Sequence, residues 1–401
     1  SALLNGSIDQ IRIFNKALSS SEVTTLYDEV YCVPTIVPTA NFNPVLYNGT
    51  GTTNARTDVG FKPDLVWIKS RGRGNPFTHR LTDSVRGVQK QISSDTTDIE
   101  ATENGVMSFD TAGFTLGDAA GFNIAASPNT FVAWNWKAGG AAVSNTDGTI
   151  TSQVSANVDA GFSIVKYTGN GSTTATIGTG LDKKVELVLI KNIDQSTVWS
   201  AVQLPEQAVG NLNNSNAMTF SYYLGNTTSS VLGFTSQNNA WNQSSSNHIA
   251  YCFHSVDGYS KIGSYTGISS GNINVSCGFR PAYIMIKATS ATGHWEILDS
   301  KRSPTMDNST GAAVRLRAND SSADANFNNS PVKFTSTGFY LDSSVTANSY
   351  GDYDKNGVTY TFMAFAEEVF NPNGVTRNAT NPFGDASELA LYKFEDNTTD
   401  S

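Results

Sequence analysis

The sequence predicts an all-β protein built of three similar antiparallel β-sandwich or jelly-roll-like modules in tandem, with jelly-roll-type strands at its two ends. Only 15% of the 401 residues are charged and 39% are hydrophobic, so the chain can form cores but lacks the charge of long surface helices. Glycine, serine, threonine and asparagine are abundant instead, and they favour turns. Short runs of β-favouring residues recur between such turns. The third observation is an internal repeat.

A unit made of a turn, a β-rich run and a lysine occurs three times, as GFKPDLVWIKS, GLDKKVELVLIKN and GFRPAYIMIKA. Each unit follows a tyrosine with a glycine-containing turn, and each precedes a second aromatic run, FVAWNW, IAYCFH or FMAFAE. A repeat of about 100–120 residues is too long for a solenoid unit. We therefore expect three modules with equivalent lysines: 43–140 with Lys69, 161–257 with Lys191, and 260–370 with Lys287.

The first β-rich run of each module is predicted to face a core. Alternation along a strand places Trp67 and Lys69 on one face. Leucine and methionine replace this tryptophan in the other modules, which indicates a packing position. The lysine is expected to extend its ammonium group to the rim of the module, and binding of an acidic ligand is the alternative. Cys252 and Cys277 lie in apolar runs and are predicted to be small core residues.

Trp136 is the candidate for stacking on a sugar ring. It lies in the second aromatic run on the same strand face as Trp134. The counterparts of this tryptophan pair are taken to be Tyr251 and Phe253 in the second module, and Phe365 and Glu367 in the third. Because Glu367 is polar, Trp136 is expected to be partly exposed. Burial in a core is the alternative.

Two Asp-Ser-x-Arg segments raise the question of hydrolase chemistry. Asp83 and Arg86 recur as Asp299 and Arg302, with a histidine nearby in each case, and no GxSxG segment accompanies them. The simpler interpretation is a turn capped by aspartate, with the arginine paired to a carboxylate or carbonyl. The adjacent Glu367 and Glu368 would point to opposite faces of a strand and so make a poor catalytic pair. We expect no enzymatic activity.

Calcium is the one candidate cofactor. The segment DYDKNG supplies oxygen ligands at alternate positions, from Asp352, Asp354 and Asn356. The twelfth position of a calcium loop would be Met363 rather than glutamate. A polar hairpin turn is the alternative interpretation.

The two ends of the chain resemble the closing and opening segments of the laminin-G-like, concanavalin-A-like jelly roll. Residues 1–31 contain the strand IDQIRIF and a helix start near Ser19, and residues 386–401 contain the strand LALYKFE. Their order along the chain is inverted relative to that family, so we expect the chain to be a segment of a longer polypeptide. The first and last strands of that fold lie side by side. We therefore expect these segments to pair, within one chain or between subunits, through Ile8, Ile11, Ile13, Leu389, Leu391 and Lys393.

The central region resembles an uncharacterised domain family frequent in virion proteins of marine bacteriophages, especially tail and appendage proteins. The resemblance is carried by GFKPDLVWIKSRG, LTDSVRGVQKQISSDTTDIEA, SFDTAGFTLG, FVAWNWKAGG and the linker at residues 145–171. It implies a structural or adhesive role in a virion or outside the cell. The implied partners are other copies of the chain, other virion proteins and a host-surface glycan. The alternative functions are a carbohydrate-binding bacterial adhesin and an extracellular filament subunit.

Charge and hydropathy exclude other partners. The net charge of −9 is unsuited to nucleic acid, which needs a basic face, and to anionic membrane surfaces. No apolar run approaches the roughly 20 residues that a membrane-spanning helix needs. We therefore expect neither a nucleic-acid partner nor membrane insertion.

Overall fold

In the computed structural model almost all of the regular secondary structure consists of antiparallel strands, which confirms the all-β fold class. The chain forms two compact units, one of residues 34–368 and one of the two chain ends. Within the described part of the chain, no helix is both long and apolar enough to cross a membrane. The structure describes residues 10–14, 16–20, 22–23, 36–72, 77–125, 130–204, 206–220, 224–236, 238–268, 271–304, 306, 313–327, 330–342, 353–367 and 388–393.

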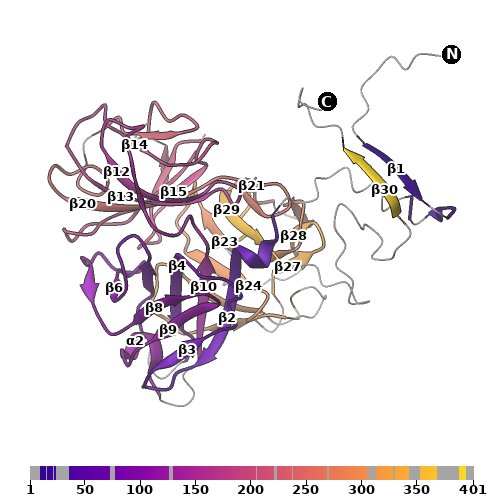
Figure 1. Cartoon of the computed structure of the whole chain (residues 1–401), viewed down its shortest axis with the longest axis horizontal. Coiled ribbons are helices and arrows are strands. Elements are labelled where there is room, and N and C mark those ends of the chain that lie inside the picture. Colours follow the sequence, from indigo (N-terminus) through magenta and orange to yellow (C-terminus); the bar gives the residue numbers. More distant parts are fainter. Residues whose placement is uncertain are drawn as a thin grey trace. The chain divides into compact units, whose positions relative to one another are not determined.

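The first module of the larger unit is a sandwich of two antiparallel sheets (Figure 1). The larger sheet has the order β2 (Phe42–Asn48), β10 (Thr130–Trp136), β4 (Leu65–Ser70) and β5 (Arg80–Asp83). The smaller sheet has the order β3 (Asn54–Arg56), β9 (Gly113–Leu116) and β8 (Val106–Asp110). The shorter elements are η1 (Pro38–Ala40), the paired strands β6 (Lys90–Gln91) and β7 (Ala101–Thr102), and α2 (Ala120–Asn123).

The second module repeats this strand order in a wider sheet. Its central strands are β13 (Phe162–Thr168), β20 (Asn247–Phe253), β15 (Leu187–Asn192) and β16 (Ser200–Gln203). The sheet continues beyond β13 through β12 (Ser152–Asn157) and β11 (Val143–Asn145), and beyond β16 through β17 (Ala208–Asn211) and β18 (Thr219–Phe220). The second layer is the pair β14 (Thr176–Gly178) and β19 (Val231–Gly233).

The third module has the same order again. Its larger sheet runs β21 (Ser260–Thr266), β29 (Thr359–Ala366), β23 (Pro281–Ala288), β24 (Trp295–Asp299), β25 (Ala313–Arg317) and β26 (Ala325–Phe327). Its smaller sheet runs β22 (Ile273–Ser276), β28 (Gly338–Leu341) and β27 (Val332–Thr335).

The strand registers make the three modules equivalent residue by residue. Trp67 lies opposite Trp134 on the neighbouring strand, and the same place in the other modules is taken by Leu189 opposite Tyr251 and by Met285 opposite Met363. The lysine two residues further on is paired to the same strand in each case, as Lys69 with Val132, Lys191 with Ile249 and Lys287 with Thr361. The predicted equivalence of the three lysines is confirmed.

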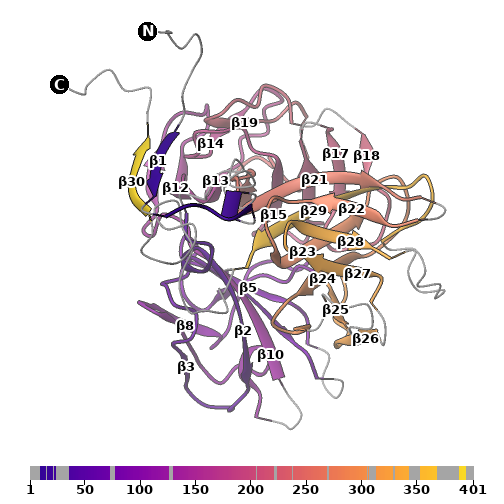
Figure 2. The ribbon, with the colours of Figure 1, turned by 90° about the vertical axis from the view of Figure 1, so that its right-hand side faces the viewer.

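The central strands of each large sheet are buried on both faces. One face packs on the smaller sheet of the same module, as Val66 and Ile68 do against Phe114. The other face belongs to one cluster that draws residues from all three modules, including Trp67. Figures 1 and 2 show the modules as purple, pink and orange groups of strands. This shared core explains why β4, β15 and β23 are buried along their whole length, whereas antiparallel sheets often leave one face to solvent.

The smaller unit contains the pairing expected of the chain ends. Strand β1 (Gln10–Phe14) pairs antiparallel with β30 (Glu388–Lys393), so that Gln10 lies opposite Lys393. The partners belong to one chain, and this places Ile11, Ile13, Leu389, Leu391 and Lys393 in one two-stranded sheet, whereas Ile8 lies outside the described residues. The helix start is also present as a capping box, because the Ser19 hydroxyl accepts from the Glu22 N–H and the Glu22 carboxylate accepts from the Ser19 N–H.

Candidate functional site

A buried ion pair lies where the first module meets the second. Asp83 Oδ2 is 2.5 Å from Arg86 Nε, and both side chains are fully buried. Asp83 Oδ1 accepts the backbone N–H of Arg86 at 2.8 Å, which caps the turn after β5. The Tyr251 hydroxyl of the second module donates to Asp83 Oδ2 at 2.8 Å. The predicted aspartate-capped turn is confirmed, and its burial leaves these side chains no access to a substrate.

The third module repeats this arrangement against the first. Asp299 Oδ2 lies 2.6 Å from Arg302 Nε, and both side chains are again fully buried. The indole N–H of Trp134 donates to Asp299 Oδ2 at 3.0 Å, and the Arg302 guanidinium lies 5.5 Å from the Trp134 ring. Each buried carboxylate therefore receives a donor from a neighbouring module. We call these two groups the junction pairs.

A second set of contacts connects the three modules in a cycle. His79, Trp199 and Trp295 each lie four residues before the end of equivalent strands. A ring nitrogen of each bonds a backbone carbonyl of another module: His79 that of Arg317 at 2.9 Å, Trp199 that of Ser93 at 2.8 Å, and Trp295 that of Asn211 at 2.9 Å. The position equivalent to His79 in the third module is thus Trp295, not His294.

The hydrogen bonds of His79 define its protonation state. Its Nδ1 accepts from Trp67 Nε1 at 2.8 Å, and an indole N–H can only donate. Its Nε2 faces the Arg317 carbonyl, which can only accept, so the proton lies on Nε2. Burial lowers the pKa of His79 well below its usual value. The imidazole is neutral and joins two modules, which is a structural role.

The three repeated lysines are buried, so the prediction that they reach the rim is wrong. Lys69 Nζ donates to the carbonyls of Ser70 and Ser321, and the latter belongs to the third module. Lys191 and Lys287 likewise donate to the carbonyl of the next residue. Burial lowers the pKa of Lys69 and of Lys191 to about 8. The lysines are buried because neighbouring modules cover the strand ends, which would be exposed to solvent in an isolated module.

Trp136 is 1% exposed, so its predicted role in stacking on a sugar ring is wrong. Its ring packs 4.8 Å from Phe42 and 5.9 Å from Tyr283 of the third module. The register shows that its counterpart in the third module is Phe365, not Glu367, because both pair with the same strand position. The predicted counterparts in the third module therefore lie two residues too far along the chain. Because side chains two residues apart lie on the same face of a strand, this shift did not change the sheet face to which the residues were assigned.

Free cysteines of the core behave as predicted. Cys252 and Cys277 are both buried and unpaired in disulfides. Burial raises the pKa of each thiol to about 12, so both stay protonated.

Within the candidate calcium segment, Asp354 stabilises a turn by a hydrogen bond. Its Oδ1 accepts the backbone N–H of Ile268 at 3.0 Å. The same bond is made in the first module by Asn123 to the N–H of Thr50 and in the second by Asn242 to the N–H of Asn170. Asn356 is exposed, and Asp352 lies outside the described residues. Among the described residues there is no group of three or more His, Cys, Asp or Glu placed to hold a metal.

The calcium prediction can be tested at Asp354. If DYDKNG binds calcium, EDTA will lower the Tm and excess calcium will restore it, with about 2.7 kcal/mol of stabilisation at a hundredfold excess over Kd. Asp354→Asn is the matched variant, because asparagine makes this turn in the other two modules. From the turn geometry we expect the Tm of wild type and variant to be equal and indifferent to EDTA in differential scanning fluorimetry. A calcium response lost in the variant would contradict this.

A stacked ring pair follows the repeated tyrosine in every module. Tyr47 stacks on Phe131 at 5.1 Å, and Tyr265 stacks on Tyr360 at 5.0 Å. In the second module Tyr167 stacks on His248, also at 5.1 Å. Burial lowers the pKa of His248 to about 4. Of the three equivalent aromatic residues, His248 is the one that can gain a proton as the pH falls below neutrality.

We expect His248→Phe to make the protein less sensitive to acid. The unfolded chain binds a proton at His248 near pH 6.5, whereas the folded chain does so near pH 4. Stability is therefore lost as pH falls through this window, by about 1.4 kcal/mol per pH unit for this group. Phenylalanine occupies the position in the first module. Urea unfolding of both proteins at several pH values measures the difference, and parallel pH profiles would contradict the expectation.

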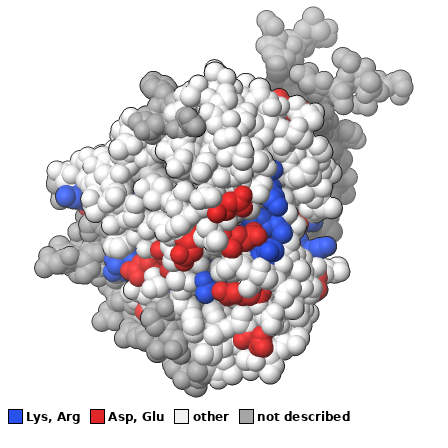
Figure 3. Space-filling model, turned by 90° about the vertical axis from the view of Figure 1, so that its left-hand side faces the viewer, with Lys and Arg blue, Asp and Glu red and all other residues white. Residues whose placement is uncertain are grey.

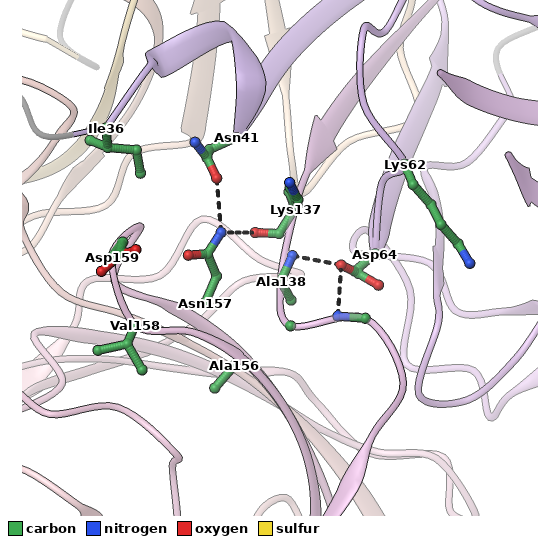
Figure 4. Close-up of a pocket in the computed structure, with 12 residues that line it drawn as sticks. Ile36, Asn41, Lys62, Asp64, Lys137, Ala138, Ala156, Asn157, Val158 and Asp159 are labelled. Atoms are coloured by element: carbon green, nitrogen blue, oxygen red, sulfur yellow. Dashed lines mark hydrogen bonds between the residues drawn. The ribbon is translucent and has the colours of Figure 1, made fainter. Parts of the chain in front are cut away.

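A polar cavity of about 550 Å³ opens between the first and second modules. Its walls come from the start of β4, the segment after β10 and the turn after β12, and Figure 4 shows their side chains. Its charged residues are Lys62, Asp64, Lys137 and Asp159. Asn157 Nδ2 holds one wall together by donating to Asn41 Oδ1 at 2.8 Å and to the Lys137 carbonyl at 3.2 Å.

Asp64 is the buried group of this cavity. It is 2% exposed, and its Oδ2 accepts the backbone N–H groups of Ala138 at 2.8 Å and Gly140 at 3.3 Å. Its Oδ1 is buried and has no hydrogen-bond partner. Glu186 takes the place of Asp64 in the second module, directly before β15. Unlike Asp64, it accepts hydrogen bonds from both the N–H and the hydroxyl of Ser255. The signal for this site in the sequence is a carboxylate just before a buried strand, which we did not single out.

One face of the molecule carries its charges unevenly. Figure 3 shows acidic and basic side chains gathered in one band across a face that is otherwise largely uncharged.

Comparison with known proteins identifies a family. Residues 37–369 match the sequence model of a family described as Domain of unknown function (DUF7483). No curated protein matches the chain. The match covers all three modules of the larger unit.

Proposed function

The chain belongs to the DUF7483 family over residues 37–369, and we propose that the protein is a non-enzymatic structural and adhesive component of a phage or phage-like particle. It would act in a tail fibre, an appendage or the capsid surface. Its partners would be other copies of itself, other virion proteins and a host-surface glycan. This proposal extends the resemblance of the central region to virion proteins.

The observation that carries the proposal is how the larger unit is connected. Strand β1 precedes it and β30 follows it, and these strands pair with each other. The larger unit is therefore inserted between two adjacent strands of another β unit, which attaches it at both ends. The inserted unit is connected to the chain at two points, and its three modules share a single core. This suits an appendage of a larger assembly.

Particle composition tests the proposal. Particles from the organism that encodes the chain would be purified on a density gradient and analysed by peptide mass spectrometry. We expect peptides of residues 34–368 to co-sediment with the major particle proteins, and antibodies against the larger unit to label particles in electron microscopy. Peptides confined to fractions without particles would contradict the proposal.

The cavity favours a second candidate function, a carbohydrate-binding adhesin of a bacterium. The observation behind it is the unpartnered Asp64 Oδ1 at the cavity, beside exposed lysines. Labelling of intact cells with the same antibodies would distinguish the two, since an adhesin would be found on the cells that make it.

A further inference from the structure

We propose that the cavity between the first and second modules binds an acidic saccharide unit, a sugar ring that carries a carboxylate. The inference rests on the adhesive part of the proposed function and assigns it a site and a ligand chemistry. Three features carry it, namely a buried acceptor without a donor, two free ammonium groups, and a wall of backbone without side chains.

The acceptor is Asp64 Oδ1. The carboxylate is held in place by two backbone N–H groups on its other oxygen, so it cannot turn toward water without losing them. A buried acceptor that lacks a donor costs free energy, which a ligand donor would recover. A sugar hydroxyl is such a donor, and the cavity of about 550 Å³ falls in the range of small-molecule sites.

The positive groups are Lys62 and Lys137. Both side chains are exposed, and neither has a hydrogen-bond or ion-pair partner among the described residues. They line the same cavity as Asp64, and in Figure 4 Lys62 and Asp64 lie on one side of it and Asp159 on the other. Ammonium groups bind carboxylates through charge-assisted hydrogen bonds.

The mixture of groups selects the ligand class. A bare phosphate would satisfy the lysines but would bring only acceptors to Asp64 and Asp159. A divalent cation would be repelled by two lysines. An acidic sugar combines one anionic group with several hydroxyl donors, and so matches both halves of the cavity.

The wall between the charged groups is formed by Gly139 and Gly140. Gly140 has a φ of +79° with open space where a Cβ would lie, and at Gly139 a Cβ would stand 2.4 Å from the Ala156 carbonyl oxygen. At Gly140 the backbone therefore borders the cavity with no side chain to fill it, whereas Gly139 packs directly on the Ala156 backbone of the second module. This leaves room for a ring beside Asp64.

Isothermal titration calorimetry with oligogalacturonate tests the inference, with a neutral galactose oligomer of equal length as the comparison. We expect the acidic oligomer to bind the full chain, to weaken with added salt, and to bind at least tenfold more tightly than the neutral one. Asp64→Asn keeps the shape but presents an amide, and should weaken binding about tenfold. Lys62→Ala should weaken it about fivefold.

Lys261→Ala is the matched control, because Lys261 is an exposed lysine of β21 that does not line the cavity. It should leave affinity within about twofold of wild type, as expected for a distant screened charge. Circular dichroism would establish that each variant is folded. Absence of binding up to about 10 mM oligogalacturonate, equal affinity for the neutral oligomer, or full affinity in folded Asp64→Asn would each overturn the inference.

The two proposals fail separately. A protein found in particles that does not bind oligogalacturonate keeps its structural function and loses this site. A protein that binds oligogalacturonate through Asp64 but is absent from particles keeps the site and loses the virion function.

Discussion

Replacing Asp83 by alanine is expected to lower the free energy of unfolding by about 3–5 kcal/mol, because Arg86 would stay buried with only its 3.4 Å contact to the Glu100 carboxylate left. The Tyr251 hydroxyl would lose its acceptor in the same step. Asp299→Ala should also destabilise the protein, because the Trp134 indole N–H would lose its acceptor and Arg302 would keep only Asp324, at 3.0 Å. Urea unfolding at neutral pH, followed by tryptophan fluorescence, measures both.

Two controls make this result specific. Asp58→Ala removes a carboxylate that pairs with Arg56 at the surface and is 46% exposed, so its cost should stay below about 1 kcal/mol. Asp83→Gln combined with Arg86→Leu removes both buried charges and should recover part of the loss. If Asp83→Ala cost no more than Asp58→Ala, the junction pairs would not contribute to holding the modules together.

The second module explains why the junction pairs depend on their neighbours. Its strand β16 ends in Gln203 where the other modules have Asp83 and Asp299, and Glu206 replaces the arginine. By the cyclic order of the modules, the residue equivalent to Tyr251 and Trp134 at this junction is Met363. Methionine has no donor for a buried carboxylate. The ion pair is therefore missing at the junction where the neighbouring module cannot support it.

The larger unit is expected to unfold in one cooperative transition, and the first module alone, residues 34–140, is expected not to fold. In isolation it would expose Trp67, Trp134 and Trp136, which are at most 1% exposed in the intact unit. Each aromatic side chain that is exposed to water loses about 2–3 kcal/mol of hydrophobic stabilisation. Summed over several such residues, this loss is comparable to the whole free energy of unfolding of a small domain.

Calorimetry of residues 34–368 and of residues 34–140 tests this expectation. The larger fragment should give one peak with equal calorimetric and van't Hoff enthalpies. Trp134→Ala should lower the stability of that single transition by about 3–5 kcal/mol, because it leaves a cavity in the shared core. A cooperative transition in the isolated first module, or three separate transitions in the larger fragment, would show that the modules are independent.

The sequence by itself determined the fold class and the threefold repeat, whereas the pairing of the chain ends was expected from their resemblance to a jelly roll. Turn-forming residues and alternating strands are local properties, so they are readable without a structure. The equivalence of Lys69, Lys191 and Lys287 follows from the same local pattern. The aspartate-capped turns at Asp83 and Asp299 were also predictable, because the cap is formed within four residues of chain.

Only the tertiary structure decided what those residues face. Trp67 was correctly predicted as a packing residue, yet the core that it enters is shared by three modules rather than contained in one. For the same reason the lysines are buried and Trp136 is not exposed. The cavity at Asp64 combines residues that are up to about 120 positions apart in the chain, and periodicity within a strand carries no information about contacts between modules.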